Sequence, residues 1–284
     1  MAFVALTTIS LIVWMRPLLA TFSLAIDDDK YTHILLILPL AAALIVQRWK
    51  AEGVAVRTWT PAAGLLVLGL AMAALARWGH VGGGDDGSAT LAVAGLVVWW
   101  IGSFAFCFGG QAVLSFAYPL FFLFWMVPLP KAVVDWIVAE LQHGSVLAAQ
   151  GIFLLFRVPV SREGITLTIP GLDLDVTSEC SSIRSSLMLL VTTMVLAYLL
   201  LKAPWRRALV IALAVPLSIA KNGLRIFTIG MLGTRVDESY LTGRFHHHGG
   251  IVFFLVALAL IFVLLWALRR GEISATSVVS RQTA

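Results

Sequence analysis

The chain has 284 residues, of which 60% are hydrophobic and only 12% are charged. Soluble globular domains carry about 25% charged residues, and the mean hydropathy of this chain is +0.95. These values exclude a cytosolic enzyme, a secreted disulfide scaffold and a disordered protein. They indicate an integral membrane protein surrounded by lipid, and the net charge of +5 therefore implies no nucleic-acid partner.

A helix needs about 20 apolar residues to cross a bilayer, and long apolar runs favour helices over a barrel of strands. The sequence predicts an all-α membrane protein with about eight transmembrane helices. They cover residues 4–26, 33–49, 61–78, 89–108, 112–130, 183–201, 208–230 and 249–268. We expect 1–284 to form a single integral membrane domain, in which the first span stays as an anchor because it lacks a small-residue cleavage site.

The region of about 131–180 reads differently from the spans. Segment 131–157 mixes charged and polar residues with apolar ones, which is typical of an interfacial or a re-entrant helix. Residues 165–169 and 172–176 alternate apolar and polar side chains around Pro170-Gly171. This pattern predicts a small β-hairpin before the sixth span, within an insertion outside the cytoplasm.

The basic residues set the expected orientation in the membrane. They gather in the loops 48–57 and 202–207 and at the start of the tail 269–284, whereas the loops 27–30 and 85–86 are acidic. The positive-inside rule puts the basic segments in the cytoplasm. Both termini and the tail are then cytoplasmic, and the starts of the sixth and eighth spans face outward.

Two cysteines have different expected roles. Cys107 lies within an apolar span and is a packing residue. Cys180 comes just before the sixth span, where a helix N-terminus and Arg184 one turn later would lower the pKa of a thiol. Cys180 is therefore either a reactive thiol or a second packing residue.

Arg225 is a charge inside the seventh span, with Lys221 and Asn222 in the same half. Such a charge either extends to the interface or faces a polar pocket, where it binds a carboxylate or an oxyanion. His246, His247 and His248 precede the eighth span. Successive helical residues point about 100° apart, so we expect no metal site and no cofactor, but one histidine as a general base.

Short motifs give the chain a resemblance to a known family. The main ones are 180–185 (Cys-Ser-Ser-Ile-Arg-Ser), 222–226 (Asn-Gly-Leu-Arg-Ile) and His246 followed by Gly250 and Phe254. Weaker matches are 31–33 (Tyr-Thr-His), 119–121 (Pro-Leu-Phe) and 128–130 (Pro-Leu-Pro). With these motifs the chain resembles the exosortase/archaeosortase family of multi-spanning membrane cysteine transpeptidases, which usually have Gly where Ser182 stands.

The resemblance implies roles for individual residues. Cys180 would be the nucleophile, Arg225 the group that stabilises the oxyanion, and His246 the general acid and base, with His247 or His248 as alternatives if the register differs. Arg184 and Asn222 would bind substrate.

The resemblance also implies a substrate and a place in the cell. The substrate would be an exported protein with a C-terminal sorting tail of the PEP-CTERM kind, cleaved at the outer face of a bacterial cytoplasmic (inner) membrane. The new carboxyl end would pass to an amine-bearing acceptor or to water. Two alternatives are a transporter, with Arg16, Lys221 and Arg225 along its path, and a non-catalytic membrane component of exopolysaccharide assembly.

Overall fold

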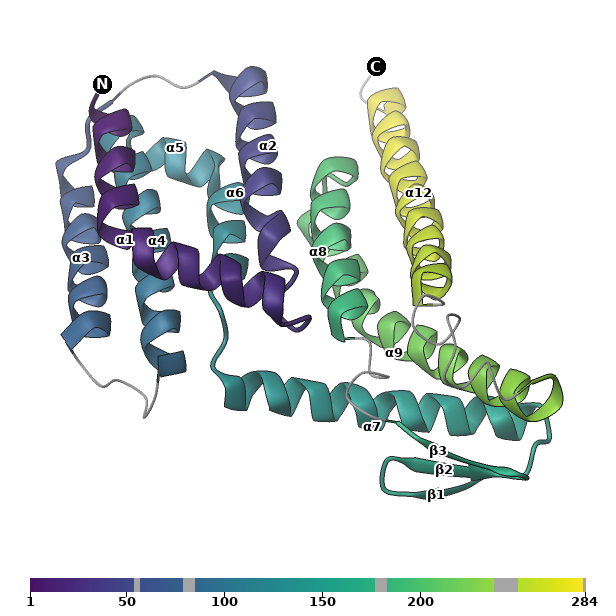
Figure 1. The fold of residues 1–284 in the computed structure, drawn as a ribbon. Helices are drawn as coiled ribbons and strands as arrows, with labels where there is room; N and C mark the ends of the chain where they lie inside the picture. The colour runs from purple at the N-terminus through teal and green to yellow at the C-terminus, as the bar shows by residue number, and fades with distance from the viewer. Residues whose placement is uncertain (54–56, 79–84, 177–182, 238–249, 283–284) are drawn as a thin grey trace. The chain divides into compact units, whose positions relative to one another are not determined.

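The computed structural model describes residues 1–53, 57–78, 85–176, 183–237 and 250–282, and two compact units divide the chain. The first unit is Met1–Val134 and the second is Asp135–Ala284. The boundary falls in the first turn of the helix α7 (Lys131–Leu155). Each unit is described by itself below (Figure 1).

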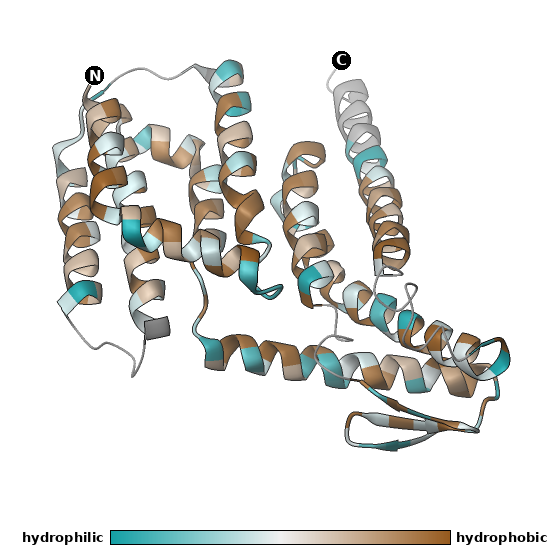
Figure 2. Cartoon of the chain, viewed as in Figure 1, coloured by the Kyte–Doolittle hydropathy of each residue, from teal (hydrophilic) through white to brown (hydrophobic). Residues whose placement is uncertain are grey.

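Helices dominate both units. Among the described residues, eight helices are long and apolar enough to cross a membrane, which confirms the predicted all-α class. The long helices are α1 (Ala2–Asp27), α2 (Ile34–Glu52), α3 (Ala63–Trp78) with the 3-10 turn η1 (Thr60–Ala62) before it, α4 (Asp85–Phe108), α7, α8 (Ile183–Leu200), α9 (Pro204–Arg235) and α12 (Gly250–Gln282). Figure 2 shows their mainly apolar composition, with hydrophilic residues along α7 and α9.

One predicted span is wrong. Residues 112–130 do not form one helix but contribute to α5 (Gly110–Ser115), α6 (Ala117–Phe122) and the 3-10 turn η2 (Leu123–Met126). The break falls at Phe116, which has φ −101° and ψ 14°. Pro119 has no backbone N–H to donate to the carbonyl four residues earlier, so a continuous helix would lose a bond there.

The eighth helix of sufficient length is instead α7, a 25-residue helix that is the least apolar of the eight. It covers the segment for which the sequence suggested an interfacial or a re-entrant helix. Residues 109–130 nevertheless lead the chain back from the end of α4 to its start, since the carbonyl of Pro128 accepts a hydrogen bond from Thr90 Oγ1.

In the first unit, α4 packs against α1 and α3 and is the most buried of the helices. Three tryptophan indoles tie α1 to α4: Trp14 Nε1 donates to Ala92 O at 2.8 Å, Trp99 Nε1 to Leu6 O at 3.0 Å, and Trp100 Nε1 to Ser10 Oγ at 2.9 Å. Buried indole N–H groups need such acceptors. These tryptophans are therefore packing residues that join α1 to α4.

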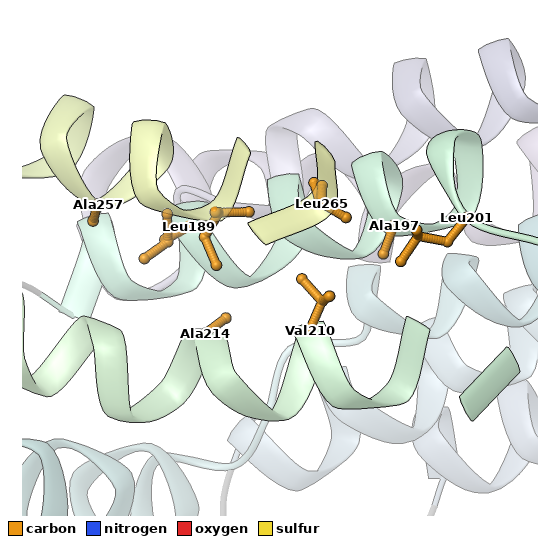
Figure 3. Close-up of a cluster of buried hydrophobic side chains, with 8 residues drawn as sticks. Leu189, Ala197, Leu201, Val210, Ala214, Ala257 and Leu265 are labelled. Carbon is orange, nitrogen blue, oxygen red and sulfur yellow. The ribbon is translucent and has the colours of Figure 1, made fainter. Parts of the chain in front are cut away.

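In the second unit, α8, α9 and α12 pack around one hydrophobic cluster (Figure 3). Its members, all 0–1% exposed, are Leu189, Ala197, Leu201, Val210, Ala214, Ala257, Ile261 and Leu265. Val210 and Ala214 of α9 face leucine and alanine residues of α8 and α12. The small side chains let α9 approach both neighbours closely.

A small antiparallel sheet follows α7, with strands β1 (Ser161–Glu163), β2 (Thr166–Ile169) and β3 (Leu172–Asp175) in that order. Ile169 pairs with Leu172 across the turn, which confirms the predicted hairpin, while β1 is an additional edge strand. The inward residues Leu167 and Ile169 pack with Val146, Ala149 and Phe153 of α7 and Ile226 of α9. The sheet is thereby anchored on the same helix that carries Arg225.

The basic ends of α8, α9 and α12 are tied together. The Glu272 carboxylate of α12 accepts hydrogen bonds from the backbone N–H groups of Lys202, at 3.0 Å, and Ala203, at 2.9 Å. Arg206 Nη1 donates to the carbonyl of Leu268, and Arg207 Nε donates to that of Leu201 at 2.9 Å. These bonds join the connection between α8 and α9 to the later part of α12.

Replacement of Glu272 by Ala should lower the stability of the second unit. Two backbone N–H groups would lose a charged acceptor, which costs about 1–3 kcal/mol in free energy of unfolding. Thermal unfolding of the full chain in detergent measures the effect. The matched control is Glu163→Ala on the exposed edge strand, which should leave the midpoint unchanged. Equal midpoints for both variants would contradict a stabilising role of the Glu272 hydrogen bonds.

Candidate functional site

The predicted site residues divide into described and undescribed ones. Cys180 and His246, together with His247 and His248, lie outside the described residues, as does Ser182. Arg184, Asn222 and Arg225 are described. In the sequence, α8 begins three residues after Cys180 and α12 begins four residues after His246. The starts of these two helices therefore show where the chain leaves the two undescribed segments.

The lengths of α8, α9 and α12 place the polar part of each helix at about the same distance from its basic end. A rise of about 1.5 Å per residue separates Arg206 from Arg225 on α9 by roughly 28 Å, and Gly250 from Arg269 on α12 by the same amount. The 18 residues of α8 span about 27 Å. Because the basic ends are tied together, the start of α8, the second half of α9 and the start of α12 converge at the opposite end.

One face of α9 is polar and buried. Four residues of this face follow the spacing i, i+3, i+4 and i+7, which places them on one side of a helix. Their exposed fractions are 3% for Ser218, 6% for Lys221, 1% for Asn222 and 8% for Arg225. Burial of Arg225 favours the polar pocket over extension of the side chain to the interface, the two readings that the sequence left open.

Two contacts join this face to α8. Ser218 Oγ donates to Ser186 Oγ at 2.6 Å, and Lys221 Nζ donates to Ser185 Oγ. Both serines follow Arg184, which is exposed on the first turn of α8. The sequence places Lys221 in a polar half of its span, but it carries no signal for a pairing with Ser185, since the two residues are 36 positions apart.

Arg225 contacts the start of α12. A Cβ atom built on Gly250 would lie 3.8 Å from Nη1 of Arg225, at ordinary van der Waals distance. The guanidinium of α9 thus lies against the first residue of the helix that follows the three histidines. Arg225 is the described residue that links the α9 face to the His246 side of the candidate site.

Asn222 is the most buried member of the polar face. Within the described part of the chain, neither its Oδ1 nor its Nδ2 has a hydrogen-bond partner. An amide buried in this way costs free energy unless a partner is supplied. Active sites are where such costs are usually found, because the partner comes with the ligand.

A second polar cluster lies in the first unit and unites two of the weaker motifs. Tyr31 Oη donates to the carbonyl of Leu129 at 3.0 Å, and Thr90 Oγ1 donates to that of Pro128 at 2.7 Å. The ring of His33 meets Trp125 edge-on, with centroids 6.5 Å apart. Segments 31–33 and 128–130 are therefore neighbours in the fold, and burial lowers the pKa of His33 from 6.5 to about 4.

Comparison with known proteins gives one match. The family model described as transmembrane exosortase covers residues 5–263, nearly the whole chain, and so confirms the family that the motifs indicated. No curated protein and no solved structure matches the chain.

The partly buried position of His33 predicts a pH-dependent stability. The folded state binds the His33 proton less readily than the unfolded chain, so the stabilisation is fully present above pH 6.5 and is lost as the pH falls toward 4. Thermal unfolding in detergent between pH 7.5 and 4.5 should show a falling midpoint, with a smaller fall for His33→Gln. The exposed His143 provides the control: His143→Gln should follow the wild type. Identical profiles for all three proteins would refute the assignment.

Replacement of Asn222 by Leu should stabilise the second unit by about 1–2 kcal/mol, because it removes two buried polar atoms that lack partners at similar volume. The midpoint of thermal unfolding of the full chain checks this. Ser218→Ala is the control with the opposite expected sign, since it breaks the bond to Ser186. A midpoint for Asn222→Leu below that of the wild type would show that the amide is satisfied in the resting protein.

Proposed function

Because the chain belongs to the transmembrane exosortase family, we propose that it is a membrane-embedded cysteine transpeptidase or protease that cleaves C-terminal sorting tails of exported proteins. One observation supports this most: the guanidinium of Arg225, buried in a span, lies against the start of α12, while the same face of α9 bonds to the start of α8. These two helix starts adjoin His246 and Cys180 in the sequence.

The proposed reaction uses three side chains. The thiolate of Cys180 attacks the carbonyl carbon of the scissile peptide bond, and Arg225 stabilises the negative charge on the oxygen. His246 takes the thiol proton and gives it to the leaving amine as the C–N bond breaks, which leaves a thioester on Cys180. An amine acceptor or water then loses a proton to His246, attacks the thioester and releases the thiol.

The substrate-binding roles fall to Arg184 and Asn222. Arg184 on the first turn of α8 would hold the thiolate or a substrate carboxylate, and the buried amide of Asn222 would bond to the substrate chain. The tail would be of the PEP-CTERM kind. No metal or cofactor takes part in this scheme.

We place the site at the outer face of a bacterial inner membrane, with both termini in the cytoplasm. The basic ends of α8, α9 and α12 lie one membrane thickness of about 30 Å from the polar ends. The positive-inside rule assigns the basic ends to the cytoplasm. Exported tails would then reach the site after translocation, together with membrane lipid and an amine-bearing acceptor.

Replacement of Cys180 by Ala should abolish processing of a tailed substrate, with a loss of at least about a thousandfold, because the thioester cannot form. Arg225→Gln should lower the rate by about a hundredfold or more through loss of the charged donor. Substrate and product are separated by gel shift after co-expression. The control is Cys107→Ala, at a buried thiol of α4, which should process normally.

Two outcomes would contradict the proposal. Normal processing by Cys180→Ala would remove the nucleophile from the mechanism. A silent Cys180→Ala together with an essential Arg225 would instead favour a transporter, in which charged residues line a path.

A further inference from the structure

The ammonium of Lys221 is buried, and no opposite charge pairs with it in the part of the chain that the structure describes. Its side chain is 6% exposed, and Ser185 Oγ accepts one of its bonds. No carboxylate pairs with it among residues 1–53, 57–78, 85–176, 183–237 and 250–282. A lysine has three donors, and a buried charge is costly unless an anion pairs with it. Arg225 one turn further on adds a like charge, which raises the affinity of this face for an anion.

Asn222 shows which kind of anion fits. Its Nδ2 donor and its Oδ1 acceptor are both buried without partners among the described residues. A phosphate headgroup presents mainly acceptors and would leave Oδ1 unsatisfied. A peptide group presents one N–H and one C=O and satisfies both atoms of the amide. The pair of side chains therefore matches a peptide that carries a carboxylate.

The spacing on α9 relates this carboxylate to the reacting bond. Lys221 lies four residues before Arg225, which is a rise of about 6 Å toward the basic end of the helix. Two residues of an extended peptide cover about 6.6 Å. A carboxylate on Lys221 would thus lie about two residues along the substrate from the carbonyl that Arg225 stabilises.

We propose that Lys221 and Asn222 form a specificity subsite for an acidic peptide, in which Lys221 binds the side-chain carboxylate of the tail and Asn222 binds an adjacent peptide group. The inference rests on the proposed function for the identity of the ligand as a sorting tail. Lys221 acts here as a determinant of substrate choice and takes no part in bond breaking.

Binding is measured with the full chain as Cys180→Ala in lipid nanodiscs, so that no turnover occurs. The probes are two fluorescein-labelled tail peptides that differ only by Glu or Gln at one position of the segment before the hydrophobic part, with the position scanned. At one position the Glu peptide should bind at least about tenfold more tightly, as expected for a charge-assisted bond. In Lys221→Met, the Glu peptide should bind only as well as the Gln peptide.

Matched variants distinguish an effect of the Lys221 charge from a general loss of folded protein. Lys221→Arg keeps the charge and should keep the preference, whereas Lys221→Gln should lose it with an unchanged affinity for the Gln peptide. Lys202→Met removes an exposed cation before the start of α9 and should behave as the parent. Thermal unfolding of each variant checks that folded protein is compared.

Three results would overturn the subsite. The first is that Glu and Gln peptides bind equally well at every position. The second is that Lys221→Met weakens the binding of both peptides equally. The third is that Lys221 raises the affinity for phosphatidylglycerol over phosphatidylcholine nanodiscs without any preference between the peptides. Failure of the proposed function looks different. The Glu preference would persist in the Cys180→Ala protein while the parent chain leaves the same tail uncleaved.

Discussion

The geometry of the candidate site depends on a set of hydrogen bonds at the opposite end of α8, α9 and α12. Glu272 accepts bonds from two backbone N–H groups before α9, and Arg206 and Arg207 bond to carbonyls of α12 and α8. Since an α-helix is a rigid rod of constant rise, residues fixed at one end determine the height of every residue at the other. The cluster around Ile261 and Leu265 holds the rods side by side between the two ends. At that other end Ser185 bonds to Lys221, and Gly250 lies beside Arg225.

The polar face of α9 is unusual for a helix long and apolar enough to cross a lipid bilayer. Lipid supplies no hydrogen bonds, so polar groups in a span pair with one another or mark a functional site. Ser218 pairs with another polar group, since it donates a hydrogen bond to Ser186. Asn222 has the features of a functional site, since neither polar atom of its amide has a hydrogen-bond partner among the described residues. Under the proposed function, the chain would hold a hydrophilic peptide segment next to the bilayer, and a polar face between packed helices suits that role.

The features that the sequence predicts well are those with a local signal. Apolar length predicts seven of the eight long helices, and alternation around Pro170-Gly171 predicts the hairpin of β2 and β3. Apolar composition does not reveal the break of 112–130 at Phe116, and alternation does not reveal β1, a strand of only three residues. Motifs indicate Arg225 and Asn222. The pairing of Lys221 with Ser185, and of Tyr31 with Leu129, arises from packing between distant segments, for which one sequence carries no periodic signal.

The crossing of α7 and α9 has a mechanical consequence. A Cβ atom on Gly223 would lie 2.6 Å from Cβ of Ala148, so the two backbones touch at a point where no larger side chain fits. Such a contact fixes the position of α7 along α9, because a shift of either helix would bring a larger side chain into collision with the other backbone. Gln142 lies two turns before that point and donates to the carbonyl of Val176, the last described residue before the segment of Cys180. The close contact between α7 and α9 therefore also fixes the point at which the described chain ends before Cys180.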